Sequence, residues 1–252
     1  HTAYRRQRQM CIRDRDNGSE LIQNFEIKNF GDQVYGVLDL RNAFIYSVNT
    51  YFAAKTDQMG KEALTKTTDK YMFNQDYPFD LEKYDSVIPY KDLNKADLAM
   101  TGFGYGKTQV TPLHMAMVTS AIANGGKMMQ PYMVSEILDK DGREVYKAKN
   151  KVLSDVTSKE NAETMRDMMV GVVNQGTGKR AYINGIQVAG KTGTTDKTDG
   201  LIDAWFVGFA PAYDPEIAVA IVIEDSEDTG GVIVAPIARG LMLDIFNQVN
   251  LN

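Results

Sequence analysis

One short stretch, Lys191-Thr192-Gly193-Thr194, constrains this chain more than any other. Ile186 and Val188 lead into it, and this apolar approach is typical of a β-strand. The stretch then combines a cation and two hydroxyl donors with a glycine, which lets the backbone come close to a ligand. The pattern therefore predicts a strand edge that binds an anion.

The same residues also match a nucleotide-binding motif. Gly185 to Thr192 follow the pattern G-x-x-x-x-G-K-[ST], in which the loop cradles phosphates. Such a loop needs a buried strand before it and a helix directly after the lysine, because the helix N-terminus helps to hold the phosphates. Here Lys179 to Asn184 precede the motif in place of a buried strand, and Gly193 to Gly200 are unsuited to start a helix. Nucleotide binding stays the alternative, and tight Mg²⁺-dependent ATP binding would support it.

The composition sets further bounds on the function. The chain has 252 residues, 43% of them hydrophobic, which is enough for one large domain or two lobes. Cys11 is the single cysteine, so no internal disulfide can form. No run of about 18 apolar residues predicts a membrane span. Residues 1–15 carry a net charge of +4 and the other 237 residues carry −9, which argues against a nucleic-acid surface.

Residues 1–15 form a basic head that differs from the rest of the chain. The head has neither helical nor strand periodicity and no capping residue, so we expect it to lie outside the fold. Arg8 to Arg15 resemble translated sequencing-adapter sequence. We therefore expect a non-native or disordered head, with the native protein continuing upstream.

Helical and strand patterns divide the rest of the chain. Asp39 and Thr111 are predicted N-caps of helices that run to Ser47 and Asn124. The second half is predicted to contain a hairpin over 131–146, a helix behind a capping box at 157–160, strands over 186–194, 204–210 and 217–224, and a last helix over 236–246. These patterns predict an α/β (α+β) fold in which helices flank an antiparallel sheet, beside an all-helical lobe.

Two short motifs carry a resemblance to a known family. Ser47-Val48-Asn49 lie at the end of a predicted helix, and Lys191-Thr192-Gly193 lie on a predicted strand. Penicillin-interacting serine acyltransferases combine Ser-x-Asn with Lys-Thr-Gly in this way. The chain resembles the transpeptidase domain of class B penicillin-binding proteins over about residues 20 to 246. Further segments match in the family's order, namely 43–52, 104–113, 121–126, 176–178, 203–211 and 235–236.

The resemblance implies a fold, a reaction and a location. Residues 16–252 would form a partial transpeptidase domain of the penicillin-binding/β-lactamase-like fold, with a helical lobe at about 36–130 and a sheet lobe at about 131–252. Class B members cross-link peptidoglycan through an acyl-enzyme formed with stem peptides that end in D-Ala-D-Ala. They are anchored at the extracytoplasmic face of the bacterial cytoplasmic membrane. The implied partners are stem peptides, β-lactam antibiotics and cell-wall synthesis proteins in the membrane, with no nucleic acid, metal or cofactor.

The resemblance also implies a role for each motif residue. Lys191, Thr192, Gly193 and Thr194 would bind the substrate carboxylate through charge-assisted hydrogen bonds. The backbone N–H of Thr194 would be an oxyanion-hole donor. Ser47 would relay a proton towards the leaving amine, and Asn49 would hold the substrate amide and the lysine beside the nucleophile. The alternative is that Ser47 and Asn49 only end a helix and that the threonines are ordinary strand residues.

The nucleophile of the family is missing from this sequence. It is the serine of a Ser-x-x-Lys motif upstream of Ser-x-Asn, and no serine here has lysine three residues on. We therefore expect an inactive fragment of an active acyltransferase. A β-lactam sensor or inactive penicillin-binding module is an alternative, although sensors usually carry Ser-x-Val where Asn49 stands here. A D-Ala-D-Ala carboxypeptidase or β-lactamase is another, which the acyl-enzyme lifetime would distinguish.

Overall fold

A three-stranded antiparallel sheet is the centre of the computed structural model, which describes residues 13–196 and 200–249. Its strands are β9 (Ala189–Asp196), β10 (Ile202–Ala210) and β11 (Ile217–Ser226), in the order β11-β10-β9. All three predicted strands are present. β9 begins three residues later than predicted, because Ile186 forms an isolated bridge with Ile183 instead of pairing with β10.

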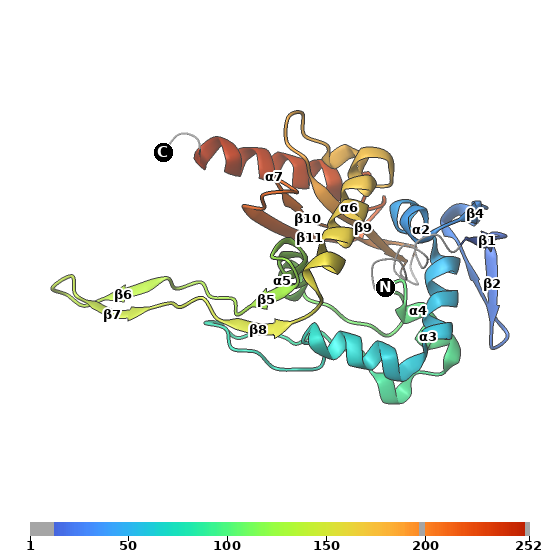
Figure 1. Cartoon of the computed structure of the whole chain (residues 1–252), viewed down its shortest axis with the longest axis horizontal. Helices are drawn as coiled ribbons and strands as arrows, with labels where there is room; N and C mark the ends of the chain where they lie inside the picture. Colours follow the sequence, from blue (N-terminus) through green and yellow to red (C-terminus); the bar gives the residue numbers. More distant parts are fainter. Residues whose placement is uncertain (1–12, 197–199, 250–252) are drawn as a thin grey trace.

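Helices cover both faces of this sheet (Figure 1). On one face, α7 (Val234–Val249) buries Ala238 and Met242 against Phe206 of β10. On the other face lie α5 (Pro112–Ala123) and α6 (Lys159–Gln175), which pack around Phe209. Because side chains alternate along a strand, neighbouring residues of β10 reach opposite helical layers. The sheet is therefore buried between helices, as the sequence predicts.

Apart from α5, the first half of the chain forms a region of helices and short strands that stands to one side of the sheet (Figure 1). It contains α2 (Leu40–Tyr46), α3 (Asn49–Lys70) and α4 (Lys95–Thr101), and α3 is interrupted by a non-helical conformation at Gly60. Short strands β4 (Gly36–Leu38) and β5 (Lys127–Met129) also fall within the predicted helical lobe. The hairpin of β2 (Ser19–Ile22) and β3 (Phe25–Lys28) packs Ile22 and Ile27 against α3 and α4.

A short N-terminal strand contains residues that are predicted to belong to the basic head. β1 (Asp14–Asp16) pairs with β4, so that Arg15 lies opposite Val37. Asp14 and Arg15, which the sequence analysis assigns to the head, therefore belong to the fold. A pairing partner more than twenty residues away leaves no local signal, which is why the head is predicted too long. Residues 1–12 lie outside the described part of the chain.

A long hairpin extends away from the molecule (Figure 1). Its strands are β6 (Glu136–Leu138) and β7 (Glu144–Lys147), and every residue of both strands is exposed. β5 pairs with β8 (Val152–Asp155) at the base of the hairpin. The helix that follows, α6, is capped by Ser158, whose Oγ accepts a hydrogen bond from the backbone N–H of Asn161. The cap therefore lies one residue after the predicted Thr157, and Asn161 rather than Glu160 stands at the third helical position, so the capping box predicted over 157–160 does not form. No helix in the described ranges is long and apolar enough to cross a bilayer.

Candidate active site

Residues far apart in the sequence line one cleft of about 830 Å³. β9 contributes Lys191 to Thr194, and the junction of α2 and α3 contributes Ser47 and Asn49. All of the predicted site residues therefore lie together. Aromatic and basic side chains from neighbouring segments complete the lining, among them Phe44, Tyr46, Phe52, Phe103, Tyr105, Lys28, Lys179 and Arg180.

Ser47 ends α2 in an unusual backbone conformation. The helix begins where Asp39 accepts a hydrogen bond from the backbone N–H of Asn42, as predicted. Ser47 then adopts the left-handed region, with φ 58° and ψ 51°. For a residue other than glycine this conformation is costly and turns the chain sharply. The turn separates α2 from α3, so Ser47 and Asn49 lie on a reversal of the chain that faces β9.

The Lys191 ammonium joins the two motifs. Its Nζ donates a hydrogen bond to Ser47 Oγ at 2.8 Å, and another to the backbone carbonyl of Thr192 at 2.9 Å. Among the described residues, no ion pair with a carboxylate involves Lys191, and the Phe44 ring lies 5.8 Å from its Nζ. Burial lowers the pKa of Lys191 from 10.5 to about 8. A cation with this environment can bind an anion and exchange a proton with the Ser47 hydroxyl.

Thr192 and Thr194 of β9 both line the cleft. Thr192 Oγ1 shares a hydrogen bond of 2.6 Å with Thr177 Oγ1. Thr194 Oγ1 accepts a hydrogen bond from the backbone N–H of Gly230 at 3.4 Å. Gly193 lies between them, where a Cβ would come within 3.0 Å of Trp205 Cβ. Thr177 is not among the site residues predicted from the sequence, although a hydroxyl between two glycines is a usable signal for a residue that approaches a ligand closely.

Asn49 is fixed by the backbone of β3. Its Nδ2 donates a hydrogen bond to the carbonyl of Lys28 at 3.1 Å. Asn49 is also the first residue of α3, and its neighbour Val48 is fully buried. The orientation of the Asn49 amide therefore depends on a segment more than twenty residues upstream, which spacing within the motif could not indicate.

The structure disfavours nucleotide binding. Lys191 and Thr192 lie inside β9, which continues to Asp196, so no helix follows the lysine. The N-terminal amides of such a helix are what a phosphate-binding loop requires. Instead, Lys191 and the threonines lie on an extended strand beside a cleft, which suits a carboxylate.

Comparison with known proteins agrees with the fold and the site. The family profile described as "Penicillin binding protein transpeptidase domain" matches residues 6–243. Stage V sporulation protein D of Bacillus subtilis is 34% identical over 221 residues, which cover 81% of this chain and 33% of that protein. Peptidoglycan D,D-transpeptidase PbpA of Mycobacterium tuberculosis is 32% identical over 230 residues, covering 86% of this chain and 46% of that protein.

Solved structures show the same architecture. The D,D-transpeptidase domain of a peptidoglycan glycosyltransferase from Eggerthella lenta superposes with a TM-score of 0.90 at 35% identity, covering 96% of this chain and 61% of that chain. The penicillin G acyl-enzyme complex of penicillin-binding protein A from M. tuberculosis has a TM-score of 0.87 at 28% identity, covering 97% and 58%.

A sheet covered by helices, with Ser-x-Asn and Lys-Thr-Gly facing one cleft, defines the class of penicillin-interacting proteins. Within that class, the chain belongs to the penicillin-binding protein transpeptidase domain family. The resemblance to class B members is thereby confirmed, as is the predicted fold class. The chain spans less than half the length of these two curated relatives.

Proposed function

We propose that this chain is part of a serine-type D-Ala-D-Ala transpeptidase that cross-links peptidoglycan through an acyl-enzyme. The observation that carries the proposal is the 2.8 Å hydrogen bond from Lys191 Nζ to Ser47 Oγ. It brings the two motifs, 144 positions apart in sequence, to one cleft large enough for a peptide end. The related enzymes named above as D,D-transpeptidases support the same reaction.

The cleft supplies binding and proton transfer in this mechanism. Lys191 and the hydroxyls of Thr192 and Thr194 bind the terminal carboxylate of the stem peptide. A serine oxygen attacks the penultimate D-Ala carbonyl and its proton passes to the lysine of Ser-x-x-Lys. The N–H of Thr194 stabilises the oxyanion, an interaction typically worth about 3–4 kcal/mol. The C–N bond breaks, and Ser47 passes a proton to the departing D-Ala amine. An amino group of a second strand then takes the acyl group, while Asn49 holds the substrate amide.

The attacking serine is the part that this sequence does not contain. Ser47 is the only serine among the described residues that line the cleft, and it lacks a lysine three positions on. We propose that a segment upstream of the sequence supplies Ser-x-x-Lys and the second oxyanion N–H. Loss of the nucleophile in serine hydrolases leaves a residual acceleration of only about 10³–10⁴ over water. The 252-residue chain alone is thus proposed to be inactive.

Location and partners follow from the same proposal. The protein acts at the extracytoplasmic face of the bacterial cytoplasmic membrane, together with membrane proteins of cell-wall synthesis. β-Lactams are its inhibitors, because their carboxylate and strained amide mimic the end of the stem peptide. Solved penicillin-binding protein A structures with penicillin G, imipenem and ceftriaxone acyl-enzymes support this assignment by similarity.

Labelling with fluorescent penicillin tests the proposal. The 252-residue chain should give no covalent label, and a gene product extended upstream through Ser-x-x-Lys should be labelled stoichiometrically. In the extended product, Lys191→Met and Ser47→Ala should slow labelling, about 10²-fold or more, whereas the exposed Ser19→Ala should leave it unchanged. Stable labelling of the short chain, or none of the extended product, would overturn the proposal. Rapid loss of the label would favour a carboxypeptidase or β-lactamase.

A further inference from the structure

A buried carboxylate lies behind the candidate active site. Asp16, at the end of β1, is only 7% exposed, and no ion pair of the described residues involves it. Its two oxygens instead accept hydrogen bonds from four neighbours. Oδ1 accepts from Gly18 N at 3.0 Å, Thr50 Oγ1 at 2.8 Å and Asn29 Nδ2 at 3.0 Å. Oδ2 accepts from Tyr35 N at 2.7 Å and from Asn29 Nδ2 at 3.0 Å.

These neighbours flank the Ser-x-Asn motif on both sides. Tyr35, held by Asp16 Oδ2, stacks its ring on Tyr46 with centroids 5.9 Å apart, and Tyr46 directly precedes Ser47. Thr50, held by Asp16 Oδ1, directly follows Asn49. One carboxylate therefore connects to the residue before the motif and to the residue after it.

Asn29 strengthens the second connection. Its Oδ1 accepts hydrogen bonds from Thr50 N and from Thr50 Oγ1, both at 3.1 Å. Its neighbour Lys28 offers the carbonyl that accepts the hydrogen bond from Asn49 Nδ2. Asn29 and Thr50 are each only 4% exposed, so water does not replace these bonds readily. The side chain of Asn49 and the start of α3 are thus fixed to the same segment.

The motif needs such a support, because Ser47 holds a left-handed conformation that a serine rarely adopts. A conformation of this kind persists only when the surrounding structure holds it. The buried Val48 fixes the middle of the turn, but it does not orient the side chains on either side.

We propose that Asp16 is a positioning residue for the Ser-x-Asn motif, acting through Tyr35 and Thr50 to hold Ser47 and Asn49 in the cleft. The inference rests on the proposed function, since it assumes that these two side chains act on the substrate. Nothing in the composition or spacing of the N-terminal segment assigns it this role.

The charge of Asp16 fits the proposal. Burial alone would raise the pKa of Asp16, but the hydrogen bonds from Tyr35, Gly18, Thr50 and Asn29 outweigh burial and lower it. The carboxylate therefore stays ionised at neutral pH, and hydrogen bonds to an ionised acceptor are stronger than neutral ones. Burial, together with the charge of Asp16, raises the pKa of Tyr35.

Two variants of Thr50 test whether the hydrogen bonds between Asp16 and Thr50 position the Ser-x-Asn motif. Thr50→Val removes the hydroxyl that bonds Asp16 and Asn29 but keeps the shape, and Thr50→Ser keeps the hydroxyl. In the 252-residue chain, Thr50→Val should speed amide hydrogen exchange about tenfold in peptides covering residues 44–54, with β10 unchanged. Thr50→Ser should stay within about twofold of the parent chain.

Acylation of the upstream-extended product gives the second measurement. Thr50→Val should lower the rate constant for acylation by penicillin by roughly 10- to 100-fold, the effect of a misplacement of about 1 Å, and Thr50→Ser should restore it. Unchanged exchange over 44–54, equal acceleration in β10, or acylation at the parent rate would each overturn the proposal. If the parent extended product is not labelled at all, the proposed function fails. Hydrogen exchange in the 252-residue chain still tests whether the Asp16 hydrogen bonds hold residues 44–54 in place.

Discussion

Lys191, the residue proposed to bind the substrate carboxylate, reduces the stability of the folded protein at neutral pH. Burial lowers its pKa to about 8, so the folded protein releases this proton at a lower pH than the unfolded chain does. Between pH 8 and 10.5 the unfolded state binds more protons, and the free energy of unfolding therefore rises with pH. The charged form present below pH 8 is the form proposed to bind a carboxylate, and it is also the form that burial disfavours.

Replacing this lysine tests the pH dependence directly. Lys191→Met should be more stable than the parent at pH 7. The difference should shrink as pH rises above 8, by at most about 1.4 kcal/mol per pH unit. Urea unfolding at pH 7, 8, 9 and 10 measures it, with the exposed Lys149→Met as control. A difference that does not vary with pH would show that Lys191 is not desolvated in the folded protein.

A substitution at Gly230 tests how closely this residue packs against the backbone of the sheet. A Cβ at this position would lie 2.2 Å from the carbonyl oxygen of Trp205 and 2.5 Å from that of Gly193. Both contacts are with the backbone of the sheet, so no side chain can move aside, and Gly230→Ala should destabilise the fold by about 1–3 kcal/mol. The same change at Gly240, a helical position of α7 with open space, should stabilise by up to about 1 kcal/mol. Thermal unfolding of both variants checks the contrast, and equal effects would contradict it.

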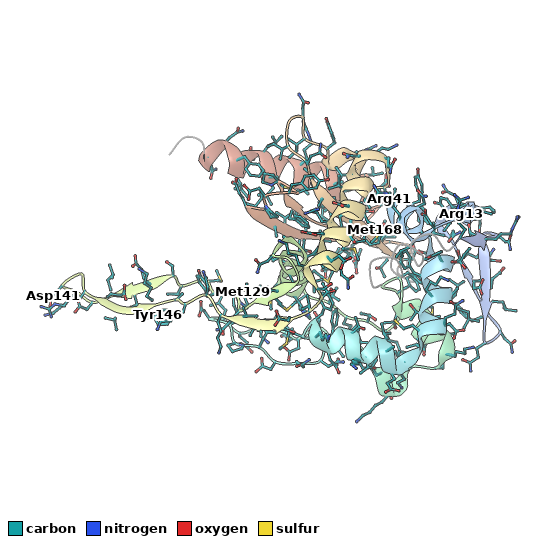
Figure 2. The ribbon with its side chains drawn as sticks, in the orientation of Figure 1. Arg13, Arg41, Met129, Asp141, Tyr146 and Met168 are labelled. Carbon is teal, nitrogen blue, oxygen red and sulfur yellow. The ribbon has the colours of Figure 1, made fainter. Side chains whose placement is uncertain are left out.

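At the scale of elements, the β6–β7 hairpin contributes little to the stability of the body. Its side chains, including the labelled Asp141 and Tyr146, stand away from the rest of the molecule (Figure 2). A two-stranded hairpin without a covered face is at best marginally stable in water. Replacing residues 136–147 by a short Gly/Ser linker should therefore change the free energy of unfolding by less than about 1 kcal/mol. A larger loss in urea unfolding would mean that the hairpin is anchored.

Local signals explain which elements could be predicted from the sequence. The caps of α2 and α5 are contacts over three residues, from Asp39 to Asn42 and from Thr111 to His114, so the sequence shows them directly. The pairing of β1 with β4 and the hydrogen bonds of Asp16 to Asn29 and Thr50 join positions 13 to 34 residues apart. No local pattern encodes such contacts. The motif residues of the cleft were found because their chemistry is unusual, whereas their supports consist of ordinary Asp, Asn and Thr.

At the scale of the whole molecule, the candidate site joins two parts with unequal cores. The largest apolar cluster of the described residues has thirteen buried members around β10 and α7. The clusters beneath Ser47 and Asn49 have four buried members each, one around α3 and α4 and one around α2 and β4. Lys191 and Ser47 thus meet between a well-packed sheet and a thinly packed helical region.

Unequal cores predict that the helical region opens before the sheet. Native-state hydrogen exchange in low urea should give amides of α3 and α4 a free energy of opening roughly 1–3 kcal/mol below that of β10. Ile27→Ala removes a buried side chain that packs between α3 and α4. It should lower the free energy of opening of the α3 and α4 amides by about 2–4 kcal/mol and leave that of the β10 amides nearly unchanged. The prediction is wrong if the α3 and α4 amides and the β10 amides share one free energy of opening in both the parent chain and the variant, because the two regions would then unfold as one cooperative unit. If the helical region opens separately, Ser47 and Asn49 lie on the less stable side of the cleft and Lys191 does not. A segment or ligand that binds in the cleft would then stabilise the site by ordering the helical side.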